Sequence, residues 1–128
     1  FRGFRDALTH NDLKKAAFDL HQATEPLYQC VLLVTTLYTP YDHNIIFLRS
    51  LAEGLDHSLF DVWPRGTRAE RAMYQKLKDA YRKARYSKHY EISREELDWL
   101  STRVEELGRK VHDICTARLE QLRQATLN

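Results

Sequence analysis

The segment that decides the fold is residues 93–122, SREELDWLSTRVEELGRKVHDICTARLEQL. Its apolar residues recur at intervals of three and four, which is the spacing of one face of an α-helix. Ser93 and Glu96 precede the apolar run with the spacing of a capping box, in which each residue satisfies a free backbone N–H. The segment therefore predicts a long helix that opens at Ser93 and carries an apolar stripe of Leu97, Leu100, Val104, Leu107, Val111 and Ile114, continuing to Leu119 and Leu122.

A second long helix is predicted near the start of the chain, from a cap at Asn11 to about Tyr38. Its apolar residues keep the same helical spacing along the whole segment. Pro26 lies inside it, where a proline removes one backbone hydrogen bond and crowds the preceding turn. We therefore expect a kink at Pro26, with helix on both sides of it.

Three shorter helices complete the prediction. They span about Phe1–Thr9, about His43–Gly54 with Asp42 as its cap, and the segment from the Thr67–Glu70 capping box to about Tyr86. Residues 56–66 are expected to form a compact loop, and no segment alternates apolar and polar residues as a strand does. The fold class is therefore all-α, an up-down antiparallel bundle of about five helices built around the two longest, in a single domain.

Composition limits the class of protein further. A chain of 128 residues can bury one continuous core without disulfide or metal cross-links. Cys30 and Cys115 both fall in apolar helical patterns, which favours reduced thiols and a cytoplasmic protein. The most apolar run, residues 30–37, is too short to cross a bilayer, so we expect no membrane partner. Because the chain begins with Phe1 and not with Met, we expect residues 1–128 to be a fragment of a longer chain.

The usual marks of metal and cofactor sites are not found in the sequence. The four glycines are isolated, so no glycine-rich phosphate loop can form. The six histidines lack zinc-ligand spacing, and the one helical pair, His21 and Glu25, has no second pair to complete a metal site. We therefore expect no metal and no cofactor.

Positive charge is concentrated between Arg65 and Lys88. This segment holds nine basic residues and two acidic ones, whereas the whole chain has a formal net charge of only +2. Such an arrangement can attract a polyanion or match an acidic neighbouring surface, and it is also typical of a solvated helix face. Charge alone leaves these three interpretations open.

Three segments resemble the HEPN family, the higher eukaryotes and prokaryotes nucleotide-binding domains. Residues 16–25, AAFDLHQATE, are similar to the family's first long helix, and HNIIFL at 43–48 is similar to the start of its next helix. The third is ARY at 84–86, which is similar to a motif near the end of the penultimate helix. The longer match, through WPR at 63–65 and YSKHYEI at 86–92, resembles the C-terminal half of bacterial proteins that fuse a minimal nucleotidyltransferase domain to a HEPN domain.

The resemblance implies a homodimer that binds nucleotide or RNA beside a nucleotidyltransferase domain, with His43, Arg85, Tyr86 and Lys88 as contact residues. Many members are metal-independent RNases with an arginine and a histidine a few residues apart, and Arg82 and His89 have that spacing. Histidine can move a proton near neutral pH, and arginine can bind phosphate through its planar fork. Three functions remain open: a nucleotide- or RNA-binding module, an RNase using Arg82 and His89, and a dimerisation domain without a ligand.

Overall fold

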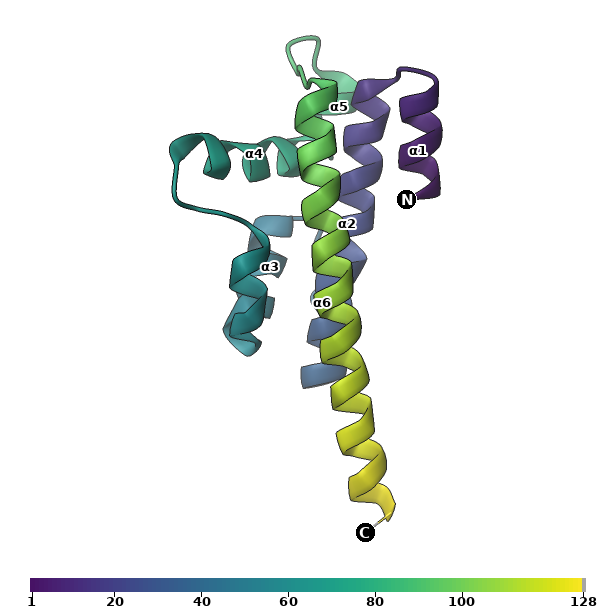
Figure 1. Cartoon of the computed structure of the whole chain (residues 1–128), viewed down its shortest axis with the longest axis vertical. Coiled ribbons are helices and arrows are strands. Elements are labelled where there is room, and N and C mark those ends of the chain that lie inside the picture. Colours follow the sequence, from purple (N-terminus) through teal and green to yellow (C-terminus); the bar gives the residue numbers. More distant parts are fainter. Residues whose placement is uncertain (128) are drawn as a thin grey trace.

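The computed structural model describes residues 1–127, and every regular element within them is helical (Figure 1). The predicted all-helical bundle is confirmed. In chain order the elements are α1 (Arg2–Thr9), α2 (Leu13–Thr36), α3 (Ile45–Leu55), the 3₁₀ helix η1 (His57–Val62), α4 (Arg68–Asp79), α5 (Lys83–Tyr86) and α6 (Arg94–Leu127).

The two longest helices, α2 and α6, run in the same direction. At the start of α6, Arg94 donates to the carbonyl of Leu8 in the last turn of α1, close to the start of α2, with an N–O distance of 2.8 Å. Much further along, the sulfur atoms of Cys30 and Cys115 lie 3.3 Å apart. The antiparallel order expected for this pair was therefore wrong. The short turn after α1 makes α1 and α2 antiparallel. The chain then comes back to the end of the bundle where α2 begins, and α6 starts from there (Figure 1).

The core lies where α2 and α6 meet, and α3, η1 and α4 close its open side. The periodicity identified its centre correctly, because the predicted stripe of α6 is buried from Leu97 to Val111. Beyond Arg118, α6 extends past the other helices, and its residues are exposed as far as Leu127 (Figure 1). The largest fully buried side chains are Trp63, Tyr28, Leu20, Ile45, Leu48, Leu59, Leu77, Leu97, Leu100 and Leu107.

The helix ends follow local hydrogen-bonding chemistry. Both predicted capping boxes are present: Thr67 Oγ1 accepts from the backbone of Glu70, and Ser93 Oγ accepts from that of Glu96, at 3.1 Å each. The other two caps were misplaced by one or two residues. Asp12 caps α2 and Asn44 caps α3, where Asn11 and Asp42 were expected, because their side-chain oxygens reach the free N–H groups. Helix α2 continues through Pro26 without a break, as expected.

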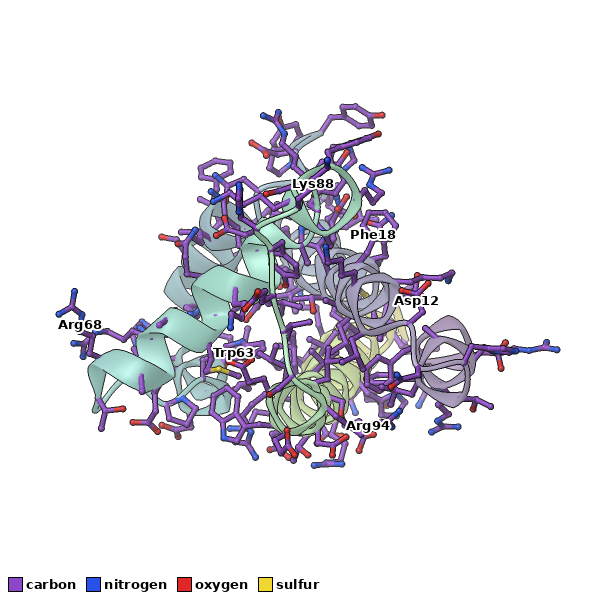
Figure 2. All side chains as sticks on the ribbon, turned by 90° about the horizontal axis from the view of Figure 1, so that it is seen from above. Asp12, Phe18, Trp63, Arg68, Lys88 and Arg94 are labelled. Atoms are coloured by element: carbon purple, nitrogen blue, oxygen red, sulfur yellow. The ribbon has the colours of Figure 1, made fainter. Side chains whose placement is uncertain are left out.

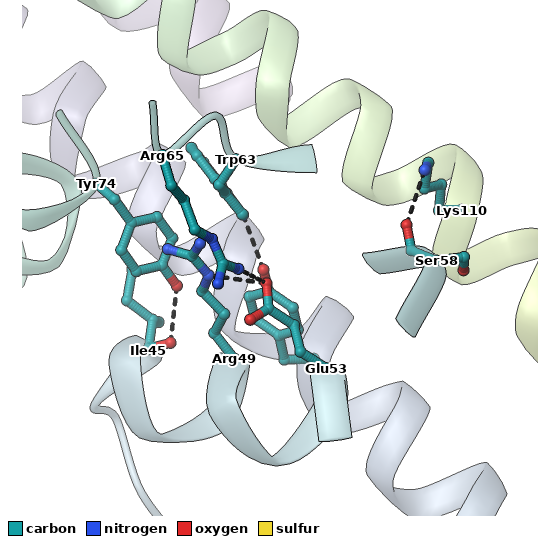
Figure 3. A network of polar contacts seen from close by, with 9 residues as sticks. Ile45, Arg49, Glu53, Ser58, Trp63, Arg65, Tyr74 and Lys110 are labelled. Atoms are coloured by element: carbon teal, nitrogen blue, oxygen red, sulfur yellow. Dashed lines mark hydrogen bonds and ion pairs between the residues drawn. The ribbon is translucent and has the colours of Figure 1, made fainter. Parts of the chain in front are cut away.

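A buried polar network holds α3 against the segment that follows η1 (Figure 3). Glu53 is only 5% exposed, and its carboxylate accepts from Arg49 at 3.0 Å and from Arg65. Trp63, expected to be a packing anchor, is buried and donates its indole N–H to the hydroxyl of Tyr28 at 2.8 Å. These contacts fix the start of the basic segment. No helix within residues 1–127 combines the length and the apolar character needed to cross a membrane.

Candidate functional site

The basic segment was predicted to form one helix to about Tyr86, and this was wrong. The helix ends at Asp79. The backbone N–H groups of Tyr81 and Arg82 bond three residues back, to Lys78 and Asp79, so the chain tightens and leaves the α-helical path. It resumes as the single turn α5. The break directs Tyr81 toward α2 and places Arg82 between two hollows in the surface.

Tyr81 is the centre of an aromatic cluster that joins α2 to the loop before α3. Its ring stacks with His21 at 5.0 Å and with His43 at 4.9 Å between centroids, and Phe18 lies in a parallel orientation at 6.3 Å. The guanidinium of Arg85 lies 4.4 Å from the centroid of Phe18 and also donates to the carbonyl of Tyr81 at 3.0 Å. Three segments distant in sequence thus meet at one point.

His43 is fixed by a carboxylate as well as by Tyr81. Its Nδ1 lies 2.8 Å from Oε1 of Glu25, a residue of α2 that is only 9% exposed. A carboxylate can only accept, so Nδ1 carries the hydrogen of this bond. The other ring nitrogen, Nε2, has no hydrogen-bond partner within residues 1–127, and the side chain of His43 is 43% exposed.

His21 supports this arrangement from inside the core. It is fully buried, and burial lowers its pKa below the usual 6.5, so the ring is neutral at pH 7. Its Nε2 lies 3.2 Å from the carbonyl oxygen of His43, which requires the single N–H to be on Nε2. Its Nδ1 lies 3.3 Å from Oε1 of Gln22, so both ring nitrogens have polar neighbours. His21 is therefore a satisfied core histidine, as its place in the apolar stripe suggested.

The surface beside His43 is a pocket of about 830 Å³, which we call the His43 pocket. Lys78, Arg82 and Lys83 supply positive charge on its wall. The acidic groups of the wall are Asp42 and Asp79, and the carboxylate of Asp79 is engaged by Lys83 at 3.4 Å and by Gln75 at 3.0 Å. Tyr41 completes it with a ring that is 97% exposed and lies edge-on to His43 at 5.7 Å. The lining residues are Tyr41, Asp42, His43, Asn44, Gln75, Lys78, Asp79, Tyr81, Arg82 and Lys83.

A second hollow of about 530 Å³ adjoins the first and shares residues 81–83 with it. Arg85, Tyr86 and Ser87 form its remaining wall, and the ring of Tyr86 is 80% exposed. Arg82 contributes to both hollows. Together they form a continuous basic surface that contains two exposed aromatic rings.

Of the residues predicted from the sequence, His43, Arg82, Arg85 and Tyr86 lie together at this surface. Lys88 and His89 lie in the exposed turn that follows α5 and line neither hollow (Figure 2 labels Lys88). The backbone N–H of His89 donates to Ser87 Oγ at 3.2 Å.

Sequence reasoning missed Tyr41, Lys78 and Tyr81, and it considered Glu25 only as a possible metal ligand beside His21. The basic segment and its interleaved tyrosines were the available signal for Lys78 and Tyr81. Nothing local links Glu25 to His43, eighteen residues away. In the described part of the chain, no three His, Cys, Asp or Glu side chains gather closely enough to hold a metal ion.

A scan against protein-family models finds no match, and a search of curated proteins finds no relative of this chain.

Proposed function

We propose that this chain is a nucleotide- or RNA-binding module of the HEPN type and that the His43 pocket is its binding site. The observation that carries the proposal is the convergence of three cationic side chains with His43 and the exposed ring of Tyr41. Lysine and arginine bind phosphate oxygens through charge-assisted hydrogen bonds, and an exposed tyrosine ring offers a nucleobase a surface for stacking.

The adjoining hollow favours a ligand longer than a mononucleotide. Arg82 contributes to both hollows, and Tyr86 presents a second exposed ring beyond it. A short single strand laid across Arg82 would bring its phosphates to the cations and one base to each tyrosine. We therefore favour single-stranded RNA over a free nucleotide, with Lys88 at the outer edge of the path.

The resemblance to fused bacterial proteins supports two further proposals: that the module acts in the cytoplasm and that it serves a nucleotidyltransferase domain. We also propose that it forms a homodimer. Leu33 and Leu37 at the end of α2 are 50% and 82% exposed, and Leu119 and Leu122 of α6 are 57% and 41% exposed. Because α2 and α6 are parallel, these apolar side chains all belong to one end of the bundle, and exposed apolar patches commonly mark interfaces.

Binding can be tested by fluorescence anisotropy with a labelled short single-stranded RNA and with ATP across a range of salt concentrations. The triple variant Lys78→Gln, Arg82→Gln, Lys83→Gln removes the cations of the pocket. We expect weaker RNA binding and a salt slope smaller by about 2, because each phosphate contact on a single strand contributes about 0.7 to the slope of log K against log salt.

The matched control removes the same charge elsewhere, through Arg2→Gln, Arg5→Gln and Arg109→Gln. None of these residues lines the His43 pocket or its neighbour. If the control weakens RNA binding as much as the pocket variant does, the attraction depends on net charge alone, and the proposed site is wrong.

A further inference from the structure

His43 connects a buried carboxylate to the surface of the His43 pocket. Its Nδ1 bonds Oε1 of Glu25 at 2.8 Å, Tyr81 stacks on its ring at a centroid distance of 4.9 Å, and its carbonyl oxygen accepts from His21. The other ring nitrogen, Nε2, lies on the side of the ring away from Glu25 and has no hydrogen-bond partner within residues 1–127. One nitrogen is therefore committed to the protein interior, and the other is free to meet a ligand.

Glu25 is a buried carboxylate without a permanent positive charge beside it. The residue is 9% exposed, and its Oε2 is buried with no partner within the described chain. Besides His43, it receives one long bond, from the amide nitrogen of Gln29 at 3.5 Å. A buried charge that no opposite charge compensates is costly. A proton gained by His43 supplies that compensation, because the hydrogen bond between the two side chains then becomes an ion pair.

The cations of the His43 pocket oppose the same protonation. Lys78, Arg82 and Lys83 line the pocket with His43, and like charges disfavour a further positive charge. Of the two carboxylates in the wall, that of Asp79 is engaged by Lys83 at 3.4 Å. The titratable and charged side chains around the His43–Tyr81 stack are His21 and Glu25 of α2, Tyr41 and Asp42 before α3, and Lys78, Asp79, Tyr81, Arg82, Lys83 and Arg85 of α4, α5 and the turn between them.

A phosphate bound in the pocket reverses this balance. Its negative charge offsets the three cations, so they no longer oppose a charge on His43. An ionised phosphodiester can only accept hydrogen bonds, so it can bond Nε2 only when that nitrogen carries a hydrogen. Because the hydrogen on Nδ1 is already donated to Glu25, a second hydrogen requires the charged imidazolium. Phosphate and proton therefore favour each other at His43, and this coupling is reciprocal.

Resting on the proposed function, we infer that the His43 pocket is a pH-regulated phosphate site, in which binding of an RNA phosphate beside His43 takes up a proton on Nε2. The proton comes from solvent and returns to it when the RNA dissociates, while the hydrogen on Nδ1 stays with Glu25. The affinity for RNA increases as the pH falls through the range in which the complex holds this proton and the free protein does not. It levels off at lower pH, where both hold it.

The test measures binding by fluorescence anisotropy from about pH 5.5 to about pH 8.5, the range around which histidines titrate, at constant salt. The probe is a short oligouridylate with hydroxyl ends and a pH-insensitive dye, because neither uracil nor a phosphodiester titrates across most of this range. The wild type should bind about 10-fold more tightly at pH 6 than at pH 8, within the usual range of coupling between two sites.

His43→Gln should lose this dependence, because the glutamine amide can donate to phosphate at any pH without gaining charge. The matched control is His112→Gln, which removes an exposed histidine of α6 that lines neither hollow and should keep the wild-type dependence. Glu25→Gln removes the counter-charge of the imidazolium, so the increase in affinity should begin at a lower pH than in the wild type. An unchanged curve in Glu25→Gln overturns the role given to the buried carboxylate.

A measurement on the wild type alone decides if either variant unfolds. The Cε1–H resonance of His43, followed by NMR against pH, should titrate at a higher pH in the presence of saturating oligouridylate than in its absence. A titration that RNA leaves unchanged overturns the inference, since reciprocal coupling requires the shift.

The remaining outcomes separate this inference from the binding proposal. A pH dependence that persists in His43→Gln, or that disappears in His89→Gln instead, overturns the assignment to His43 and leaves RNA binding intact. Wild-type affinity that is the same at pH 6 and pH 8 does so as well. Failure to bind the oligouridylate at any pH overturns the binding proposal itself.

Discussion

At the scale of the residue, Glu53 is a buried charge on which the stability of the fold depends. Its carboxylate is almost fully buried, and Arg49 and Arg65 both bond it (Figure 3). Removing one partner from a buried ion pair leaves the remaining charge without compensation, which costs more than the pair itself contributes. The interaction also ties α3 to the segment that leads into α4, so its loss acts on two elements.

We expect Glu53→Ala to lower the free energy of unfolding by about 3 kcal/mol, measured from urea titration followed by circular dichroism. The control is Glu120→Ala, which removes an exposed carboxylate paired with Arg123 on the same molecule. Exposed pairs contribute little, so the control should change the free energy by less than about 1 kcal/mol. Equal effects of the two substitutions would show that the Glu53 network is not a stabilising feature.

At the scale of the element, the end of α6 has no partner within the described chain. Leu119 and Leu122 lie one turn apart and are among its exposed apolar residues. An isolated helical extension of this length gains little from its own hydrogen bonds in water. The proposed homodimer would give it a partner and would cover these leucines.

We expect the double variant Leu119→Gln, Leu122→Gln to sediment as a monomer under conditions in which the wild type sediments as a dimer. Its Tm should also lose the concentration dependence that association imposes. The control variant Gln121→Ala, Ala125→Gln changes exposed residues of the same turns and should remain dimeric. A wild type that sediments as a monomer at all concentrations would rule out the dimer.

At the scale of the whole molecule, the parallel arrangement of α2 and α6 brings Cys30 and Cys115 together. Both thiols are free, and their sulfur atoms are 3.3 Å apart. If α6 started at the same place but ran in the opposite direction, Cys115 would lie far from Cys30. Chemical cross-linking of the two cysteines therefore tests the topology directly.

We expect oxidised glutathione to convert the two thiols into one intramolecular disulfide, with release of two molecules of reduced glutathione. The bond should raise the free energy of unfolding by up to about 4 kcal/mol, because it closes a long loop. Burial raises the pKa of Cys115 to about 11, so the fraction of its reactive thiolate increases with pH and closure should be faster at pH 9 than at pH 7. Mass spectrometry without reductant measures the product.

Cys30→Ser is the control for this experiment and should yield no intramolecular bond. Disulfides that form only between chains, or mixed disulfides with glutathione that never close, would contradict the contact between α2 and α6.

The helices and several of their ends were determined by the sequence alone. Helical periodicity and a capping box depend on residues within four positions of one another, so α6 and the starts at Thr67 and Ser93 could be predicted without knowledge of packing. The same local signals placed two caps one or two residues too early, since Asn11, Asp12, Asp42 and Asn44 are all good cap residues and the backbone path selects among them.

Only the tertiary structure decided the direction of α6, the break after Asp79 and the composition of the candidate site. A stripe buries equally well against a parallel or an antiparallel neighbour, so periodicity cannot give direction. The break is favoured by contacts of Tyr81 with rings on α2 and before α3, and the bond between Glu25 and His43 spans two elements. Such interactions depend on how distant segments pack against one another, and a local sequence pattern does not predict that packing.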